Sequence, residues 1–115
     1  MNNQQLQHLA IEALNDLKAI DLITFDVRGL TTITDSMIIC SGRSKQHVKS
    51  LAENIVKKAK NSHVSYIKTE GERTGEWVIV DLADVVIHVM LPTTRTFYNL
   101  EDLWQPIIHL RENQR

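Results

Sequence analysis

The sequence is poor in the features that mark several classes of protein. It has a single cysteine, Cys40, so no disulfide can form within the chain, and we expect a cytosolic protein rather than a small secreted one. There is no run of about 18 apolar residues, and the N-terminus has no basic or long apolar region, so we expect neither a membrane span nor a signal peptide. A formal net charge of −1 argues against a protein that binds nucleic acid chiefly through its phosphates.

What the sequence does contain is typical of one globular domain. Its 115 residues are 43% hydrophobic and 23% charged, which suits a real but modest core. No internal repeat, linker or low-complexity segment interrupts it. We therefore expect a single cytoplasmic domain over residues 1–115, with a polar C-terminal tail at about 111–115.

Two segments have apolar residues at helical spacing, and five have the apolar or β-branched runs of strands. The predicted helices span residues 4–20 and 45–61, and Ser44 is a good N-cap for the second. The predicted strands span residues 22–28, 37–41, 64–69, 77–82 and 85–91. A short third helix is expected after a loop at 93–96. The order αββαβββα predicts an α/β domain around a five-stranded mixed sheet with flanking helices.

The most informative segment is GEWVIVDLADVVIHVM, residues 75–90, which predicts a hairpin with two apolar faces. Because side chains alternate along a strand, Trp77, Ile79 and Asp81 share one face of the first strand, and Leu82 lies on the other. Two interpretations are open: the hairpin is central in the sheet, or one of its faces awaits a partner. If both long helices pack on one side of the sheet, the opposite face is thinly covered.

Several single residues allow a structural and a functional interpretation. His88 interrupts an apolar strand, and we favour a buried, hydrogen-bonded histidine over a surface contact. Cys40 stands in an apolar run and is interpreted as a buried, inert thiol. Tyr98 and Trp104 are interpreted mainly as packing residues of the last helix. The lysines of the 45–61 helix form either a solvated face, which we favour, or a docking surface for nucleic acid.

No residue pattern indicates a metal, a cofactor or a catalytic centre. The five histidines and Cys40 form neither a paired-histidine zinc motif nor a CxxC motif, and there is no GxSxG or Walker sequence. The spacing of Asp81 and Asp84 would place them on opposite faces of a strand, so we interpret them as turn-forming residues. We expect no enzyme. The alternative is a nucleotidyltransferase-like enzyme, acting on a nucleotide or RNA, that uses the turn at 41–44 with one of these aspartates.

Several motifs in the same order give a resemblance to a known family. They are TDSMIICSGRS at residues 34–44, EG at 70–71 and WVIVDLADVVIHVM at 77–90, followed by RTFYNLEDLW at 95–104. Over roughly residues 5–105 the chain resembles the ribosomal silencing factor RsfS (YbeB/Iojap) family. The agreement of several ordered motifs is far more specific than that of any one of them.

The resemblance implies a fold similar to that of nucleotidyltransferases, without their catalytic residues. It implies binding to the large ribosomal subunit through ribosomal protein L-fourteen, on the surface that meets the small subunit. A protein bound there sterically blocks subunit association and represses translation when nutrients are scarce. Members of the family also form homodimers, and any contact with ribosomal RNA would be secondary.

A ribosomal protein is expected to be basic, so acidic residues around an apolar anchor would complement it. We therefore predict Trp77 and Leu82 as anchors, Tyr98 as a flanking contact, and as charge partners Glu70, Asp81 and Asp84. A plain RNA-binding or dimerisation module that uses the lysine-rich helix is the remaining alternative.

The sequence departs from the usual family pattern at two places. Ala83 stands where the family usually has glycine, and because alanine disfavours a positive φ, we expect a right-handed conformation in this turn. Ser36 and Met37 stand where the family often has an aromatic residue after the Thr-Asp pair. Neither change removes a proposed contact.

Overall fold

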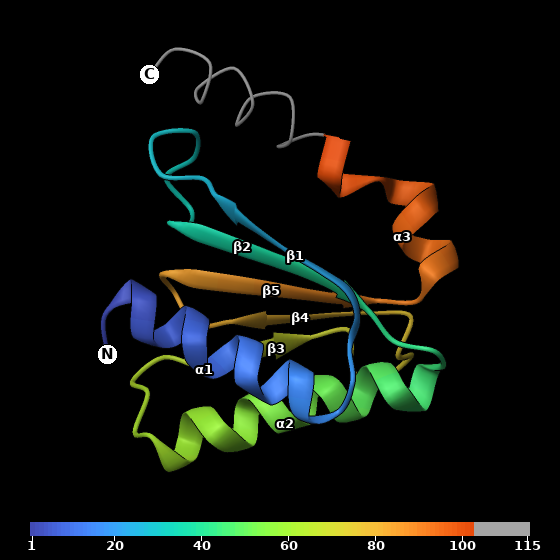
Figure 1. Cartoon of the computed structure of the whole chain (residues 1–115), viewed down its shortest axis with the longest axis horizontal. Coiled ribbons are helices and arrows are strands. Elements are labelled where there is room, and N and C mark those ends of the chain that lie inside the picture. Colours follow the sequence, from blue (N-terminus) through green and yellow to red (C-terminus); the bar gives the residue numbers. More distant parts are fainter. Residues whose placement is uncertain (103–115) are drawn as a thin grey trace.

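The structure, a computed structural model, describes residues 1–102 as an α/β fold built on a five-stranded mixed sheet. In chain order its elements are α1 (Asn3–Asp16), β1 (Ile20–Asp26), β2 (Ser36–Ser41), α2 (Lys45–Asn61), β3 (Lys68–Glu70), β4 (Trp77–Asp81), β5 (Val85–Met90) and α3 (Pro92–Tyr98) (Figure 1). The predicted α/β class, the five-stranded mixed sheet and the element order are confirmed. The predictions for Trp104 and for the tail at 111–115 lie outside the described residues.

The strand order of the sheet is β1-β2-β5-β4-β3. β2 and β5 pair in parallel, whereas the other neighbouring strands pair antiparallel. Every residue of β5 is buried, and this explains its unbroken apolar run, because a central strand is covered on both sides. Within the β4–β5 hairpin, β5 is therefore the central strand of the sheet, and β4 lies between β5 and the edge strand β3.

Both long helices cover the same side of the sheet (Figure 1). The main core contains the inner residues of α1 and α2 together with one face of the strands, including Ile38, Val80 and Ile87. A smaller cluster lies on the other side, around Ile39 and Met90. Among residues 1–102, only the short helix α3 packs on that side, as expected for a face with less helical cover, although Ile39 and Met90 are themselves fully buried.

Local interactions at their ends explain where the two long helices begin. A capping box starts α1: the Asn2 side chain accepts from the backbone N–H of Gln5, and the Gln5 side chain accepts from that of Asn2. α2 spans the predicted residues 45–61, and the Ser44 hydroxyl caps it by accepting from the backbone N–H of His47 at 3.1 Å.

The predicted bounds of four elements are wrong, and one of them is β1, which spans Ile20–Asp26 rather than 22–28. α1 ends at Asp16 rather than residue 20, because Lys18 has a φ of 59°, which is outside the right-handed helical region. β3 is shorter than the predicted 64–69, since it pairs with β4 only over Lys68–Glu70. α3 begins at Pro92 and includes the predicted loop at 93–96, because the fixed φ of proline suits the first turn of a helix.

The turn between β4 and β5 is strained at Ala83, so the predicted right-handed conformation is wrong. Ala83 has a φ of 71°, and the backbone N–H of Asp84 donates to the carbonyl of Leu82 at 3.0 Å. A hydrogen bond between residues two positions apart, with a positive φ at the residue between them, defines the rarer and strained form of the γ-turn. The Asp81 carboxylate accepts from the N–H of Ala83 at 2.8 Å and helps to hold this conformation.

Candidate functional site

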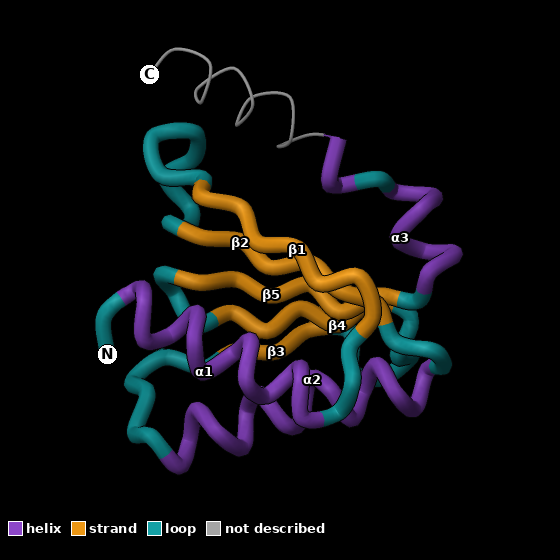
Figure 2. Tube along the Cα trace, in the orientation of Figure 1, coloured by secondary structure: helices purple, strands orange, loops and turns teal. Residues whose placement is uncertain are grey.

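The candidate site is the side of the sheet opposite α1 and α2, which we call the open face. Figure 2 shows both long helices on one side of the strands, and among residues 1–102 α3 is the helix on the other. From the register and the alternation of side chains, the open face carries Phe25, Met37, Ile39, Trp77, Ile79, Asp81, Val86, His88 and Met90. Five of these residues are buried, and four are partly exposed: Met37, Trp77, Ile79 and Asp81. An apolar surface that stays partly exposed is typical of an interaction site.

Trp77 lies between two other rings on this face. Its backbone pairs with Met90, which makes His88 its diagonal neighbour across the β4–β5 pair. The Trp77 indole N–H donates to His88 Nδ1 at 3.0 Å, and the two ring centroids are 5.9 Å apart. The ring of Tyr98, from α3, lies 4.9 Å from that of Trp77. Three elements thus place three rings together.

His88 is buried, with 8% of its surface exposed, and its hydrogen bond with Trp77 confirms the favoured interpretation. Burial disfavours the charged imidazolium and lowers the pKa of His88 to about 4. The ring is therefore neutral at physiological pH. Because Nδ1 accepts the indole proton, the proton of the neutral ring belongs on Nε2.

The short helix α3 contributes the exposed aromatic residues of the site. Tyr98 is 55% exposed although it stacks on Trp77, and Phe97 is 80% exposed. The Phe97 ring meets that of Tyr98 edge-on at 5.1 Å. Tyr98, which the sequence analysis names as a flanking contact for the partner, lies beside Trp77. Phe97 was not predicted as a contact, although it stands in the same sequence motif.

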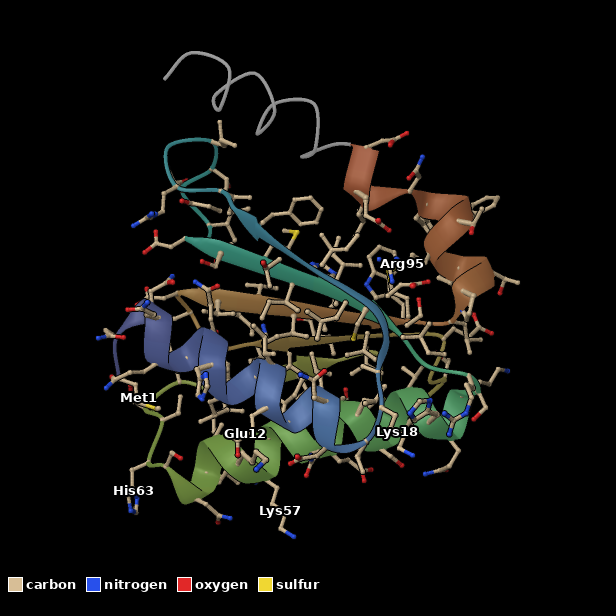
Figure 3. All side chains as sticks on the ribbon, viewed as in Figure 1. Met1, Glu12, Lys18, Lys57, His63 and Arg95 are labelled. Atoms are coloured by element: carbon tan, nitrogen blue, oxygen red, sulfur yellow. The ribbon has the colours of Figure 1, made fainter. Side chains whose placement is uncertain are left out.

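Arg95 fixes α3 to the sheet, a role that the sequence reasoning missed. Its side chain lies between α3 and the strands (Figure 3) and is only 9% exposed. It donates from Nη1 to Ser41 Oγ at 3.1 Å and from Nε to Glu101 Oε1 at 2.5 Å. An arginine in a short helix gives no sequence signal of burial, because arginine is usually exposed and its partner on the sheet, Ser41, is 54 residues away.

The three predicted charge partners do not form one cluster: one lies on β3, one at the end of β4 and one in the turn before β5. Glu70 is exposed on β3, where its backbone pairs with Ile79, and it forms an ion pair with Lys68 at 3.3 Å. Asp81 is half-buried and is used by the Ala83 turn. The Asp84 side chain is exposed. Within residues 1–102 no group of three or more histidine, cysteine, aspartate or glutamate side chains could hold a metal ion.

Gly71 allows the chain to turn closely over the start of β4. It has a φ of 87°, and a Cβ at this position would lie 2.0 Å from the carbonyl oxygen of Trp77. Only glycine both adopts this positive φ readily and leaves room for the carbonyl oxygen. The glycine of the Glu70-Gly71 motif is therefore required for the close approach of the chain to Trp77.

Leu82 is not part of the open face. It is 2% exposed and belongs to the core between the sheet and the two long helices. Its direction follows from the alternation that places Trp77 on the other side. A side chain buried in this way cannot serve as a surface anchor, so we correct the prediction and leave Leu82 out of the proposed contact surface.

The residues considered for catalysis have structural partners. Ser41 is buried and accepts from Arg95, Ser44 caps α2, and the backbone N–H of Arg43 donates to His47 Nδ1 at 2.9 Å. Cys40 has no exposed surface, as predicted, and burial raises the pKa of its thiol to about 12.

The comparisons with known proteins agree with one another. The model of the family described as "Ribosomal silencing factor during starvation" matches residues 1–115. The ribosomal silencing factor RsfS of Chromobacterium violaceum is 45% identical over 104 residues, which are 90% of this chain and 85% of that protein. A mouse protein named for mitochondrial assembly of the ribosomal large subunit is 34% identical over 99 residues, covering 84% of this chain and 43% of its own length.

A solved structure extends the likeness to three dimensions. A crystal structure of a Chromobacterium violaceum protein has a TM-score of 0.89 and 45% identity, and the match covers 91% of this chain and 88% of the other. Within residues 1–102, no helix is long and apolar enough to cross a bilayer. On the family match over the whole chain, and on these relatives, the chain belongs to the ribosomal silencing factor RsfS family, also represented by the Iojap proteins.

Proposed function

We propose that the open face binds the large ribosomal subunit through ribosomal protein L-fourteen. Bound there, the protein sterically blocks association with the small subunit and represses translation under nutrient limitation. The observation that carries the proposal is Trp77, a partly exposed indole at the centre of an aromatic group on the less covered side of the sheet. Membership of a family named for ribosome silencing supports the same conclusion.

The chemistry of the face suits a basic protein partner. Tryptophan and tyrosine are enriched among the residues that dominate binding energy, and such anchors are usually surrounded by polar groups. Glu70 and Asp81 flank the apolar strip along β3 and β4. Carboxylates at such a rim mainly increase the association rate and the specificity for a basic partner. The name of the mouse relative also points to the large subunit.

Sedimentation with purified ribosomal subunits tests the proposal. We expect the protein to sediment with isolated large subunits, to reduce the formation of whole ribosomes when small subunits are added, and to bind purified L-fourteen directly. Absence from the large-subunit fraction would contradict the proposal. Binding to bare ribosomal RNA with a steep dependence on salt would instead favour an RNA-binding module.

When the protein is off the ribosome, we propose that a second copy of the chain covers the same open face. The dimer would then compete with docking, so the fraction bound to the large subunit would depend on protein concentration. Analytical ultracentrifugation of the free protein, with and without L-fourteen, measures this competition. A dimer that persists when L-fourteen binds would contradict it.

A further inference from the structure

We propose that His88 is a positioning residue for docking, which holds the indole of Trp77 in the orientation that faces the partner. The inference rests on the proposed function, because that function assigns Trp77 to the contact surface. His88 itself is nearly covered by the fold, so it acts through Trp77 rather than by touching the partner.

Two contacts restrain the indole from two sides. The hydrogen bond from Trp77 Nε1 to His88 Nδ1, 3.0 Å long, fixes the N–H edge of the ring. The ring of Tyr98, inclined at 50°, packs against the indole from α3. A tryptophan side chain has only two rotatable bonds, so these two contacts are enough to select one rotamer. Such preorganisation lowers the ordering cost that a partner must overcome on binding.

The identity of residue 88 matters because few side chains could take its place. A carboxylate would bring a charge into a buried site, and an aliphatic side chain could not accept the indole proton. Neutral imidazole offers a lone pair at Nδ1 and packs as a flat ring between Val86 and Met90 on the same face of β5. Glutamine is a neutral replacement of similar size, and its amide oxygen can accept the indole proton.

The hydrogen bond also defines what the partner must offer. The indole N–H is already satisfied by His88, so the docked partner does not need an acceptor at that point. Trp77 therefore engages its partner through the exposed ring surface. A partner group of apolar or guanidinium character fits that surface.

The experiment compares His88→Leu with His88→Gln in full-length protein that carries Trp104→Phe, so that Trp77 gives the only indole N–H resonance. Ile87→Val is the matched control. Ile87 is the neighbouring residue on β5 and faces the helices, so this substitution removes one core methylene without touching Trp77. Each variant is measured in two ways: the Trp77 indole resonance in ¹H–¹⁵N spectra, and the affinity for isolated large subunits by sedimentation.

We expect His88→Leu to shift the indole resonance and to bind about threefold to tenfold more weakly, which corresponds to the net value of one hydrogen bond. His88→Gln should keep most of the affinity, and Ile87→Val should change neither readout. An unchanged indole resonance in His88→Leu, or a shifted one with unchanged affinity, overturns the proposal. So does a His88→Gln variant that binds as weakly as His88→Leu.

Trp77→Ala, measured in the same series, separates this inference from the proposed function. If Trp77→Ala binds as well as the unaltered protein, the docking site is wrong, and the role of His88 in docking falls with it. If Trp77→Ala loses binding while His88→Leu does not, only the positioning role of His88 is wrong.

Discussion

Trp77 and Leu82 point to opposite faces of the sheet. Trp77 lies on the open face against His88 and Tyr98, while Leu82 is 2% exposed in the core beneath the long helices. On the proposed function, one short stretch of chain therefore serves both binding and stability, but through separate residues. This separation allows the two effects to be measured independently.

Replacing Trp77 by alanine should weaken binding to the large subunit by at least about 30-fold, as expected for a central aromatic anchor. The Leu82→Ala variant should instead lower the free energy of unfolding by about 2–5 kcal/mol, because it leaves a cavity in the core. Below its melting temperature it should still bind. Urea unfolding and sedimentation with large subunits measure the two effects. Normal binding by Trp77→Ala would remove the proposed site.

Changing Ala83 to glycine should stabilise the protein by about 1 kcal/mol, because glycine adopts the φ of 71° without a steric penalty. The gain appears as a higher denaturant midpoint with an unchanged slope. Ala10→Gly, in the interior of α1, is the control and should destabilise by about 1 kcal/mol or more, because glycine is unfavourable in a helix. A loss of stability in Ala83→Gly would show that the turn is not strained.

The stability of the fold should fall as the pH is lowered from about 6.5 to about 4 through the effect of His88. Burial lowers the pKa of His88 to about 4, so the unfolded chain takes up this proton at a higher pH than the native state does. The linked loss is about 3 kcal/mol, and it is absent at neutral pH. Urea unfolding measures the free energy of unfolding at each pH. Its decrease across this pH range should be larger by this amount in the unaltered protein than in His88→Gln. If the stabilities of the two proteins change with pH in parallel, the low pKa assigned to His88 is contradicted.

Cys40 should not react with thiol reagents in the native protein at mildly alkaline pH. The side chain has no exposed surface, and burial raises the pKa of the thiol to about 12, so almost no thiolate is present. Labelling should be complete in denaturant and should follow the opening of the fold under native conditions. A reagent such as Ellman's gives the rate directly, and rapid native labelling would show that β2 opens locally.

Much of the site could be predicted because strand alternation is a local property. The alternation in residues 77–82 places Trp77 and Leu82 on different faces, and this parity alone argued against using both as anchors of one surface. The naming of Leu82 as an anchor followed the family resemblance and not the geometry. Arg95 and the contact between Tyr98 and Trp77 could not be predicted, since they join segments that are far apart in the chain.

By itself, the sequence determined the α/β order, the bounds of α2 and the two apolar faces of the hairpin. These features follow from short-range chemistry: the spacing of apolar residues, the hydroxyl of Ser44 and the alternation of strand side chains. Only the tertiary structure decided which face the long helices cover, how Ala83 is forced to a positive φ, and how His88 meets Trp77. Those outcomes depend on strand register and on long-range packing, whose energies no local sequence pattern contains.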